Sequence, residues 1–385
     1  MRALTLRADF APRDGYPLDE RERREHRIQN GNMVWRHPQI TLDEIAEPVP
    51  KPDEVIVQVA AVGICGSDMH MYEADAATGY MLYPGFVKTP NVLGHEFAGR
   101  VVSVGSAVRD LREGDLVSVE EIQWCGECIA CRRGLVNHCE NHEELGFTIP
   151  GAMAEYIACR ARYCWKLDDV ADRYGEDIAL QLGAMVEPSG VSYQGLFNRN
   201  PSWLPGNHVL IFGAGPIGLT AQALAQAAGA GRLIMVDPSP SRRKIAAEMG
   251  ATDLLTGSEK LDEAVLEITK GRGVDTVVEA AGVAELTIQK LEQCLAVNST
   301  LVDIGLGERN PVMPIVTYKY RGVNYVGSLG HAGMGVFQNV IRLLANGRID
   351  LRPIVSARLP LTEAKAAFQR LESREDAKIL LLPNE

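Results

Sequence analysis

Short stretches in the first half of the chain alternate between apolar and polar positions, as half-buried β-strands do. The alternation is regular in VIVQVAAVG (55–63) and AGRVVSVG (98–105), and Gly and Pro residues separate such stretches. No pattern of helical length competes there, so we expect an irregular, barrel-like β domain. Its expected strands are QITLDEIAEPV (39–49), DEVIVQVAAVGIC (53–65), EFAGRVVSVGSAV (96–108) and GDLVSV (114–119).

The pattern changes after about Asn200, where short apolar runs alternate with helical stretches. Such alternation indicates an α/β domain with a doubly wound parallel sheet, the Rossmann type of fold. We expect this domain at 194–336, inserted into a first domain formed by 1–193 and 337–385. Its expected strands are HVLIFGAG (208–215), RLIMVD (232–237), GVDTVVEAAG (273–282), STLVDIGLG (299–307) and NYVGSLG (324–330). Its expected helices include 216–230, 240–251 and AELTIQKLEQCLAV (284–297).

The motif GAGPIG (213–218) lies between an expected strand and an expected helix, which is the context that a dinucleotide-binding turn requires. The first glycine permits a tight turn, the second lets the backbone approach a pyrophosphate, and the third allows close helix–strand packing. Unpaired N–H groups at the helix N-terminus can then bind phosphates. The expected cofactor-binding residues of the motif are Gly213, Gly215, Pro216, Ile217 and Gly218.

Asp237 ends the next expected strand, where a carboxylate can accept hydrogen bonds from a ribose diol. The same charge would repel a 2′-phosphate, so NAD is favoured over NADP. Arg242 and Arg243 lie about one helical turn further on and oppose this interpretation. We expect Arg242 to lie near the cofactor, although either arginine could equally face solvent. The alternative is an ordinary strand-to-helix turn with a surface aspartate.

Four of the eight cysteines form the pattern CxxCxxCx7C. In a chain without a secretion signal, such clustering points to metal rather than to disulfides. Four thiolates can complete a tetrahedral zinc site and leave no open position, as a structural zinc requires. The expected ligands are Cys125, Cys128, Cys131 and Cys139. The scattered Cys159, Cys164 and Cys294 are expected to be small buried side chains.

Composition and charge exclude several classes of function. The 385 residues suggest two or three domains, and 46% apolar with 23% charged residues is ordinary for a globular protein. A net charge of −11 disfavours nucleic-acid and anionic-membrane partners. The chain start lacks an apolar signal region and no stretch is apolar enough to span a bilayer, so we expect a cytoplasmic protein. The mixed-sign run DERERREHR (19–27) is expected to be a solvated surface segment.

A second group of metal-competent residues is dispersed along the chain: Cys65 in GICGSDMH, His95 and Glu96 in GHEFAG, and Glu187 in EPSG. Cys, His and carboxylate side chains all bind zinc, and a catalytic site needs three of them plus an exchangeable position. Spacing alone favours a buried cysteine, a packed histidine and two surface carboxylates. It is a resemblance between whole motifs that makes a metal site the better interpretation.

GICGSDMH, GHEFAGRVVSVG, the four-cysteine segment, EPSGV and GAGPIG resemble, in order and spacing, the zinc-containing medium-chain dehydrogenase/reductase family. The resemblance extends from about Asp53 to the C-terminus. It implies a GroES-like catalytic domain, a Rossmann coenzyme domain and a cleft between them. It also implies one catalytic and one structural zinc per chain, NAD as cofactor, and a homotetramer or homodimer.

Matched to this family, Cys65, His95 and Glu187 would hold the catalytic zinc. A glutamate at the last position resembles the sorbitol and threonine dehydrogenase branch. Glu96 would be a further carboxylate able to exchange onto the metal. Ser67 and His70 match the proton relay of the family, which carries the proton of the substrate hydroxyl through the cofactor ribose to solvent.

The resemblance implies that a secondary alcohol is oxidised to a ketone. The stretches GYMLYPGF, IQWCGECIACRRGLVNHCENHEELGF and GSLGHAGMG are similar to an inositol-pathway member of the branch, which implies a cyclitol or inosose substrate. Open alternatives are another polyol, sugar or amino-alcohol dehydrogenase, an NAD-dependent epimerase without net redox change, and a non-catalytic member. Candidate substrate contacts, each of which could equally be a surface or packing residue, are Tyr72, Glu73, Tyr80, Tyr83, Glu120 and Glu144. His331 departs from the family, where many members have a basic residue near the cofactor.

Overall fold

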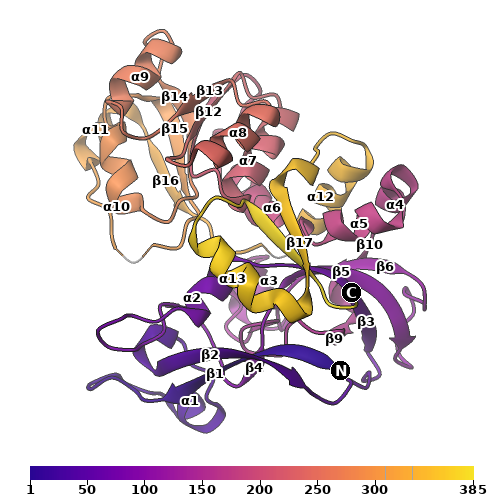
Figure 1. Ribbon diagram of the computed structural model, residues 1–385. Coiled ribbons are helices and arrows are strands. Elements are labelled where there is room, and N and C mark those ends of the chain that lie inside the picture. The colour runs from indigo at the N-terminus through magenta and orange to yellow at the C-terminus, as the bar shows by residue number, and fades with distance from the viewer. Residues whose placement is uncertain (308, 332) are drawn as a thin grey trace.

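The computed structural model describes residues 1–307, 309–331 and 333–385. Figure 1 shows two parts, a lower one formed by the N-terminal half and an upper one formed by the middle of the chain. The C-terminal segment, drawn in yellow, returns from the upper part to the lower one. The lower part is the expected GroES-like domain, and the upper part is the expected Rossmann domain.

The lower part is organised around a seven-stranded sheet in the order β10-β6-β5-β3-β18-β17, with β9 paired to β3. The strands expected at 53–65, 96–108 and 114–119 are confirmed as β3, β5 and β6. The C-terminal strand β18 pairs antiparallel with β3, so the two ends of the chain share one sheet. The members are β3 (Glu54–Gly63), β5 (Glu96–Val104), β6 (Leu116–Val119), β9 (Tyr156–Arg160), β10 (Cys164–Lys166), β17 (Val355–Pro360) and β18 (Lys378–Leu382).

A three-stranded sheet, β2-β1-β4, lies below it in Figure 1. The strand expected at 39–49 is β2 (Trp35–Glu44), and it pairs with β1 (Arg2–Phe10). We did not predict β1, although RALTLRADF alternates, and β4 is only Asn91–Val92. Buried Leu4, Leu6 and Trp35 join the same hydrophobic core as residues of β3 and β5. The mixed-charge run forms the short helix α1 (Glu20–Glu25).

The upper part contains six parallel strands in the order β13-β12-β11-β14-β15-β16. Alternate residues of β11 enter different cores, Val209 and Ile211 on one face and Leu210 and Phe212 on the other. Burial of both faces is what a doubly wound sheet requires. The strands are β11 (His208–Phe212), β12 (Arg232–Val236), β13 (Asp253–Leu255), β14 (Val274–Glu279), β15 (Leu295–Asp303) and β16 (Asn324–Gly327), and the helices α7 (Pro216–Ala227), α8 (Pro240–Glu248), α9 (Leu261–Ile268), α10 (Ala284–Thr287) and α11 (Ile315–Arg321).

The helix expected over 284–297 is wrong in its second half. The α-helix ends at Thr287, a 3-10 turn covers Ile288–Leu291, and β15 begins at Leu295. Leu295 pairs with Val274 of β14 and is fully buried. The helical periodicity of this stretch is therefore overridden by burial in the parallel sheet, which the local pattern does not record.

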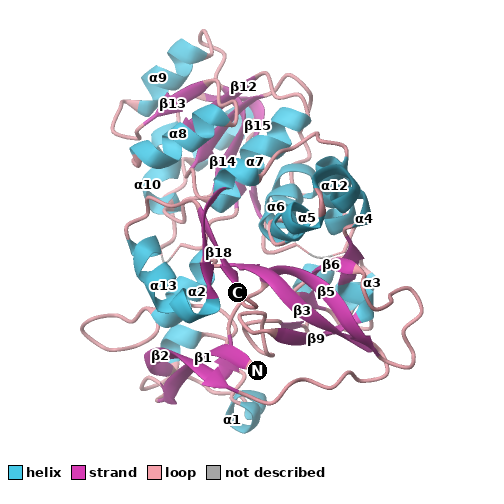
Figure 2. Cartoon of the chain, turned by 45° about the vertical axis from the view of Figure 1, so that its right-hand side comes forward, coloured by secondary structure: helices cyan, strands magenta, loops and turns pink. Residues whose placement is uncertain are grey.

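The helices α4, α5, α6 and α12 pack against one another (Figure 2). Helix α12 contacts α4 and α6, although about 150 residues separate it from them. The bounds are α4 (Asp168–Tyr174), α5 (Glu176–Gly183), α6 (Val186–Tyr193) and α12 (Val336–Ala345), and α13 (Ala364–Glu372) connects β17 to β18. The coenzyme-type sheet lies within 194–336, and domain boundaries at 193 and 336 stay a prediction.

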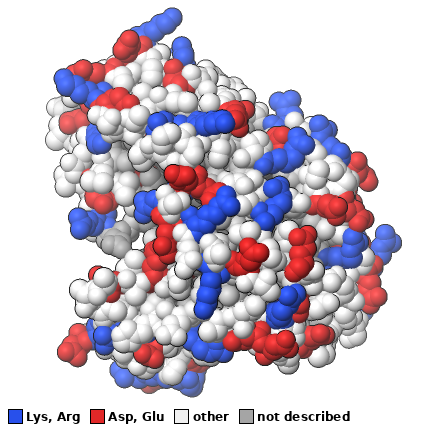
Figure 3. Space-filling model, in the orientation of Figure 1, with Lys and Arg blue, Asp and Glu red and all other residues white. Residues whose placement is uncertain are grey.

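On the face shown in Figure 3, side chains of both charge signs are interspersed. Among the described residues, no helix is long and apolar enough to cross a membrane.

Candidate active site and metal centres

Strand register brings together two donor groups that lie thirty residues apart in the chain. Gly63 of β3 pairs with Glu96 of β5, so Cys65, just beyond β3, lies beside His95, just before β5. Cys65 is also the residue preceding helix α2 (Gly66–Tyr72), and its backbone N–H donates to Asp68 Oδ2 at 2.9 Å. This helix start fixes the cysteine at the strand end.

Cys65, His95 and Glu96 each direct one ligand atom into the same space, and these atoms lie within 4.8 Å of one another. His95 and Glu96 are buried, and Glu96 Oε1 has no hydrogen-bond partner within the described chain. An unpaired buried carboxylate oxygen is costly unless a cation satisfies it. Sulfur, nitrogen and oxygen donors with this spacing fit a zinc ion.

Two charged residues that we did not predict support these donors. Asp68 is fully buried, with Oδ1 3.7 Å from His95 Nδ1, so the charge of a carboxylate lies beside the ring on its Nδ1 side. Lys378, from β18, is also fully buried; its Nζ donates to Ile64 O at 2.9 Å and pairs with Glu96. Burial by itself lowers the pKa of Lys378, but the neighbouring Glu96 outweighs it and the pKa is raised.

The position of Asp68 could have been inferred from the sequence, because it is the third residue of the helix that begins directly after Cys65. The position of Lys378 could not have been inferred from the sequence, because only the pairing of β18 with β3 brings it to Glu96.

Glu187 lies in α6 and belongs to a neighbouring cluster instead. Glu121, Glu187 and His331 are buried and have ligand atoms within 4.8 Å of one another. The structure therefore groups Glu96, rather than Glu187, with Cys65 and His95. The two clusters are neighbours, because α6, which holds Glu187, packs against β5, which begins at Glu96. Burial is the main cause of the raised pKa of Glu96; the charge of Lys378 lowers that pKa, and the charge of Glu187 raises it further.

Burial and opposite charges act together on the pKa values of the second cluster. Burial opposes the charge on His331, but Glu121 and Glu187 raise its pKa well above the usual range. Burial likewise opposes the charge on Glu187, whose pKa is nevertheless lowered by His331. Burial raises the pKa of Glu121 to about 7. These shifts favour the charged forms of His331 and Glu187, whereas the shift of Glu121 favours its protonated form.

The expected relay residues lie on α2. Ser67 is buried, and its Oγ is 3.4 Å from His95 Nε2, next to the donor set. His70, one turn later, is partly exposed and lies 3.6 Å from Glu73. The helix thus leads from the donor set toward the surface.

The candidate substrate contacts separate into two groups. Tyr83 is buried, and Phe147 lies between it and His95, with ring centroids 5.5 Å and 4.7 Å away. By contrast, Tyr80 donates to Ala11 O and is covered by two arginines, so it holds the N-terminal segment. The others have protein partners: Tyr72 packs on Phe368, Glu73 pairs with His70, Glu120 accepts from Trp165, and Glu144 lies near His142.

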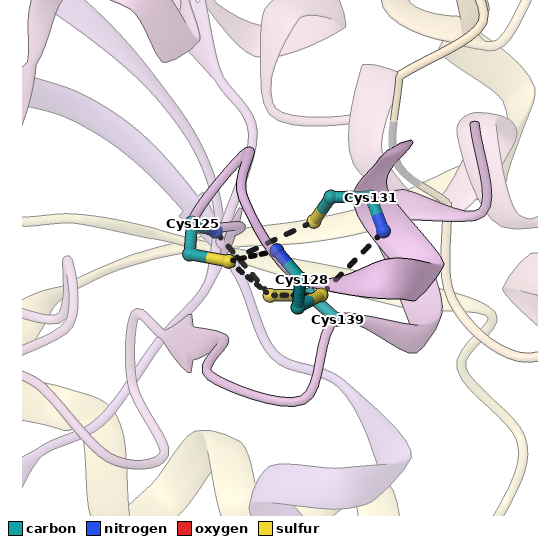
Figure 4. Close-up of side chains that lie close together, drawn as sticks. All are labelled: Cys125, Cys128, Cys131 and Cys139. Atoms are coloured by element: carbon teal, nitrogen blue, oxygen red, sulfur yellow. Dashed lines mark hydrogen bonds between the residues drawn. The ribbon is translucent and has the colours of Figure 1, made fainter. Parts of the chain in front are cut away.

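The four-cysteine segment folds as a separate loop in which all four sulfur atoms point inward (Figure 4). The Sγ atom of Cys125 is 3.5 Å from that of Cys139 and 4.0 Å from that of Cys131. Backbone N–H groups donate to the sulfurs, and that of Glu127 is the first of several that lower the pKa of Cys125 to about 6. Thiolates at this spacing fit a closed, tetrahedral zinc site.

The remaining cysteines follow the expectation in part. Cys159 and Cys294 are buried, whereas Cys164 is only partly buried.

The glycine motif occupies the turn between β11 and α7, as predicted. Gly213 has φ +89°, and a Cβ on Gly218 would lie 1.7 Å from Gly213 O, so neither position tolerates a side chain. At Gly215 the space is open, with only Arg242 Nη1 within 4 Å. Pro216 and Ile217 begin α7. An open cradle at a helix N-terminus fits the pyrophosphate of a dinucleotide.

Asp237 follows β12 directly and is almost fully buried. Its carboxylate accepts from Ala214 N and Ser239 N, both at 2.7 Å, which holds it at the rim of the glycine turn. Arg242 is partly buried and donates to Asp376 O at 2.9 Å, so it does not face solvent. Arg243 donates to Asp237 O at 2.5 Å.

The fold and the two donor sets define a zinc-type, nicotinamide-dependent oxidoreductase, and comparison with known proteins agrees. Residues 51–169 match the alcohol dehydrogenase GroES-like domain, and residues 216–346 match the zinc-binding dehydrogenase domain. The chain belongs to the zinc-containing medium-chain dehydrogenase/reductase family, in its polyol dehydrogenase branch, and it is an enzyme of the alcohol dehydrogenase type.

Among its relatives, scyllo-inosose 3-dehydrogenase of Thermotoga maritima is 37% identical over all of both chains. A solved structure of a candidate alcohol dehydrogenase from Thermotoga maritima has a TM-score of 0.95 at 37% identity, covering 99% of this chain and 100% of that one. A candidate zinc-binding dehydrogenase from Sinorhizobium meliloti 1021, bound to NADP, has a TM-score of 0.79 at 26% identity, covering 98% and 99%.

Proposed function

We propose that this protein oxidises a secondary alcohol of a cyclitol or inosose to a ketone, with NAD as hydride acceptor and two zinc ions per chain. The observation that carries the proposal is the cluster of Cys65, His95 and Glu96 in a chain whose coenzyme domain also has an open dinucleotide turn. Full-length similarity to scyllo-inosose 3-dehydrogenase supports the substrate class.

Cys65, His95 and Glu96 would hold the catalytic zinc, and the Glu187 carboxylate belongs to the neighbouring buried cluster. When bound, zinc lowers the pKa of a substrate hydroxyl and so favours loss of its proton. Asp68 keeps the His95 ring oriented, and Lys378 holds Glu96 in place. Carboxylate donors make the site harder than an all-thiolate one and suit it to oxygen-rich substrates.

Ser67 and His70 provide a route for the proton. Ser67 Oγ lies beside His95, where it can accept the proton of a substrate hydroxyl. His70 follows on the same helix, partly exposed, so it can pass the proton to solvent. The hydride transfer itself is the chemistry of the nicotinamide, and the protein positions the reacting carbon and excludes water.

A screen for NAD reduction with inositols, inososes, sugars and threonine tests this assignment. We expect steady NADH formation with an inositol or inosose. Conversion of the substrate without NADH accumulation would indicate an epimerase. Preference for threonine or an open-chain polyol would indicate a threonine or polyol dehydrogenase instead.

Replacement of Cys128 with serine is expected to release one of the two zinc ions and to lower the unfolding midpoint by roughly 5 to 10 °C. A structural zinc contributes folding free energy, and 1 kcal/mol corresponds to about 2–4 °C in a domain of 150–250 residues. Elemental analysis and thermal unfolding measure both effects. Cys164→Ser, which changes a cysteine outside the cluster, is the control, and equal stability and zinc content in both variants would contradict a structural site.

Replacement of Asp237 with serine is expected to raise the KM for NAD about tenfold and to narrow its advantage over NADP. The carboxylate is placed to meet the ribose diol, and its charge disfavours a 2′-phosphate. Initial rates with both cofactors measure the effect, and Asp237→Asn separates charge from hydrogen bonding. If the wild type uses NAD and NADP equally, the proposal fails, and Arg242 or Arg243 becomes the candidate 2′-phosphate contact.

We also propose a homotetramer or homodimer. Within the described part of the chain, the coenzyme sheet ends at β16 without a neighbouring strand, and apolar side chains of α11 and β16 are exposed there: Ile315, Val316, Tyr320 and Tyr325. An uncovered sheet edge beside exposed apolar side chains is typical of a subunit interface.

A further inference from the structure

The segment that follows β16 leaves the coenzyme domain and is held by the catalytic domain on both sides of His331. The side chain of Asn137 donates to Leu329 O at 2.9 Å. The backbone N–H of Gly333 lies 3.4 Å from Glu120 Oε2 and donates to it. His331 is therefore delivered to a defined place in the catalytic domain by contacts that do not involve its own side chain.

The imidazole of His331 is completely buried between two carboxylates of the catalytic domain. Its Nε2 is hydrogen-bonded to Glu121 Oε2 and lies 3.1 Å from Glu187 Oε1. Glu121 follows β6, whereas Glu187 belongs to α6, so the three groups come from three separate segments. A buried carboxylate with such a partner is restricted to one orientation, because turning away would leave its charge unpaired.

Helix α6 has a space for this imidazole. Gly190 lies three residues after Glu187, on the same helix face, and a Cβ there would approach His331 Cγ to 3.2 Å. Phe337 covers the imidazole at a centroid distance of 4.7 Å. The pocket thus fits the ring closely and leaves Glu187 as its neighbour.

The position of this segment connects it to the cofactor. In a doubly wound sheet the dinucleotide binds beyond the carboxyl ends of the parallel strands, and the segment holding His331 follows the carboxyl end of β16. On the other side, His331 contacts Glu187 of α6, and α6 packs against β5, the strand that begins at Glu96.

We propose that His331 is a positioning residue which, with Glu121, holds the Glu187 carboxylate beside the catalytic metal site and so couples the coenzyme domain to that site. The inference rests on the proposed function, because it assumes that the Cys65, His95 and Glu96 set binds a metal ion. According to this inference, the position of the Glu187 carboxylate depends on His331 of the coenzyme domain as well as on α6.

The test compares wild type with His331→Leu, His331→Gln and Glu121→Gln, each loaded with cobalt(II) in place of zinc. The visible spectrum of cobalt reports its coordination, and competition with a chelator reports metal affinity. We expect His331→Leu and Glu121→Gln to change the spectrum and to weaken metal binding at the catalytic set about 10- to 100-fold, as loss of outer groups does. His331→Gln keeps an N–H donor and should recover much of the affinity.

His208→Leu removes a histidine elsewhere in the coenzyme domain and should change neither readout. An unchanged spectrum and affinity in His331→Leu, even with a lower unfolding midpoint, would overturn the inference and leave His331 a packing residue. If that variant does not fold, Glu121→Gln, which keeps the shape of the side chain, decides in the same way.

Two further outcomes would overturn it. A third ion per chain that is lost in His331→Leu would mean that Glu121, Glu187 and His331 bind metal themselves. Wild-type protein that binds metal only at the four cysteines would contradict the proposed function itself, and this inference with it.

Discussion

Replacement of His95 with alanine is expected to lower kcat by at least about a thousandfold. His95 is the donor held from both sides, by the register of β3 with β5 and by Asp68 behind its ring. Its loss would remove the charge stabilisation that a catalytic metal supplies, which amounts to several kcal/mol, and about 1.4 kcal/mol corresponds to a tenfold change in rate. Initial rates and zinc content per chain measure the effect.

The same substitution has a smaller structural effect, since the ring is buried against Phe147 and its removal leaves a cavity. Thermal unfolding separates this loss from catalysis, and His208→Ala is a control at a histidine outside the donor set. A His95→Ala enzyme that retains more than about a tenth of its activity with full zinc content would exclude a catalytic metal here.

The second large effect concerns substrate choice: kcat/KM for cyclohexanol is expected to be at least about 10⁴-fold lower than for the best inositol or inosose. A site that hydrogen-bonds several hydroxyl groups rejects analogues without them, because its own buried polar groups would remain unpaired. The Tyr83 hydroxyl is one candidate group of this kind, because the Tyr83 ring is buried against Phe147, which packs on His95. Ethanol and 2-propanol should be equally poor substrates.

Tyr83→Phe provides a matched comparison, since it removes one hydroxyl and keeps the ring on Phe147. We expect it to lower kcat/KM for the cyclitol about tenfold, the cost of one hydrogen bond in a buried site, and to leave that for cyclohexanol unchanged. Oxidation of cyclohexanol as efficiently as any inositol or inosose would instead mean that the tyrosines line an apolar wall, and the cyclitol assignment would fail.

Features whose residues are close in sequence could be predicted from the chain alone. The four cysteines lie within fifteen residues, so their spacing already restricts them to one loop, and the structure brings all four sulfurs together. The glycine turn is local in the same sense, since Gly213 and Gly218 act on a single strand-to-helix connection. Strands with regular alternation, such as β3 and β5, were predicted for the same reason.

Tertiary structure decided which carboxylate lies with Cys65 and His95. Motif resemblance pairs Cys65 and His95 with Glu187, whereas in the fold Glu96 is the carboxylate grouped with them. The reason is the register of β3 with β5, which places the start of β5 against the end of β3, while α6 directs Glu187 toward His331. A motif specifies which residue types are present, but not which of two carboxylates lies closer to Cys65 and His95.

The supporting charges were decided in the same way. Lys378 lies 282 residues from Glu96 and His331 lies 210 from Glu121, and each pair meets only because a C-terminal strand or a coenzyme-domain segment returns to the catalytic domain. Local periodicity carries no signal for such pairs, and it also misassigned 284–297, where pairing of Leu295 with Val274 overrides helical spacing. Sites formed by residues that are close in the chain could thus be predicted from the sequence, whereas contacts between distant segments depend on strand register and domain packing.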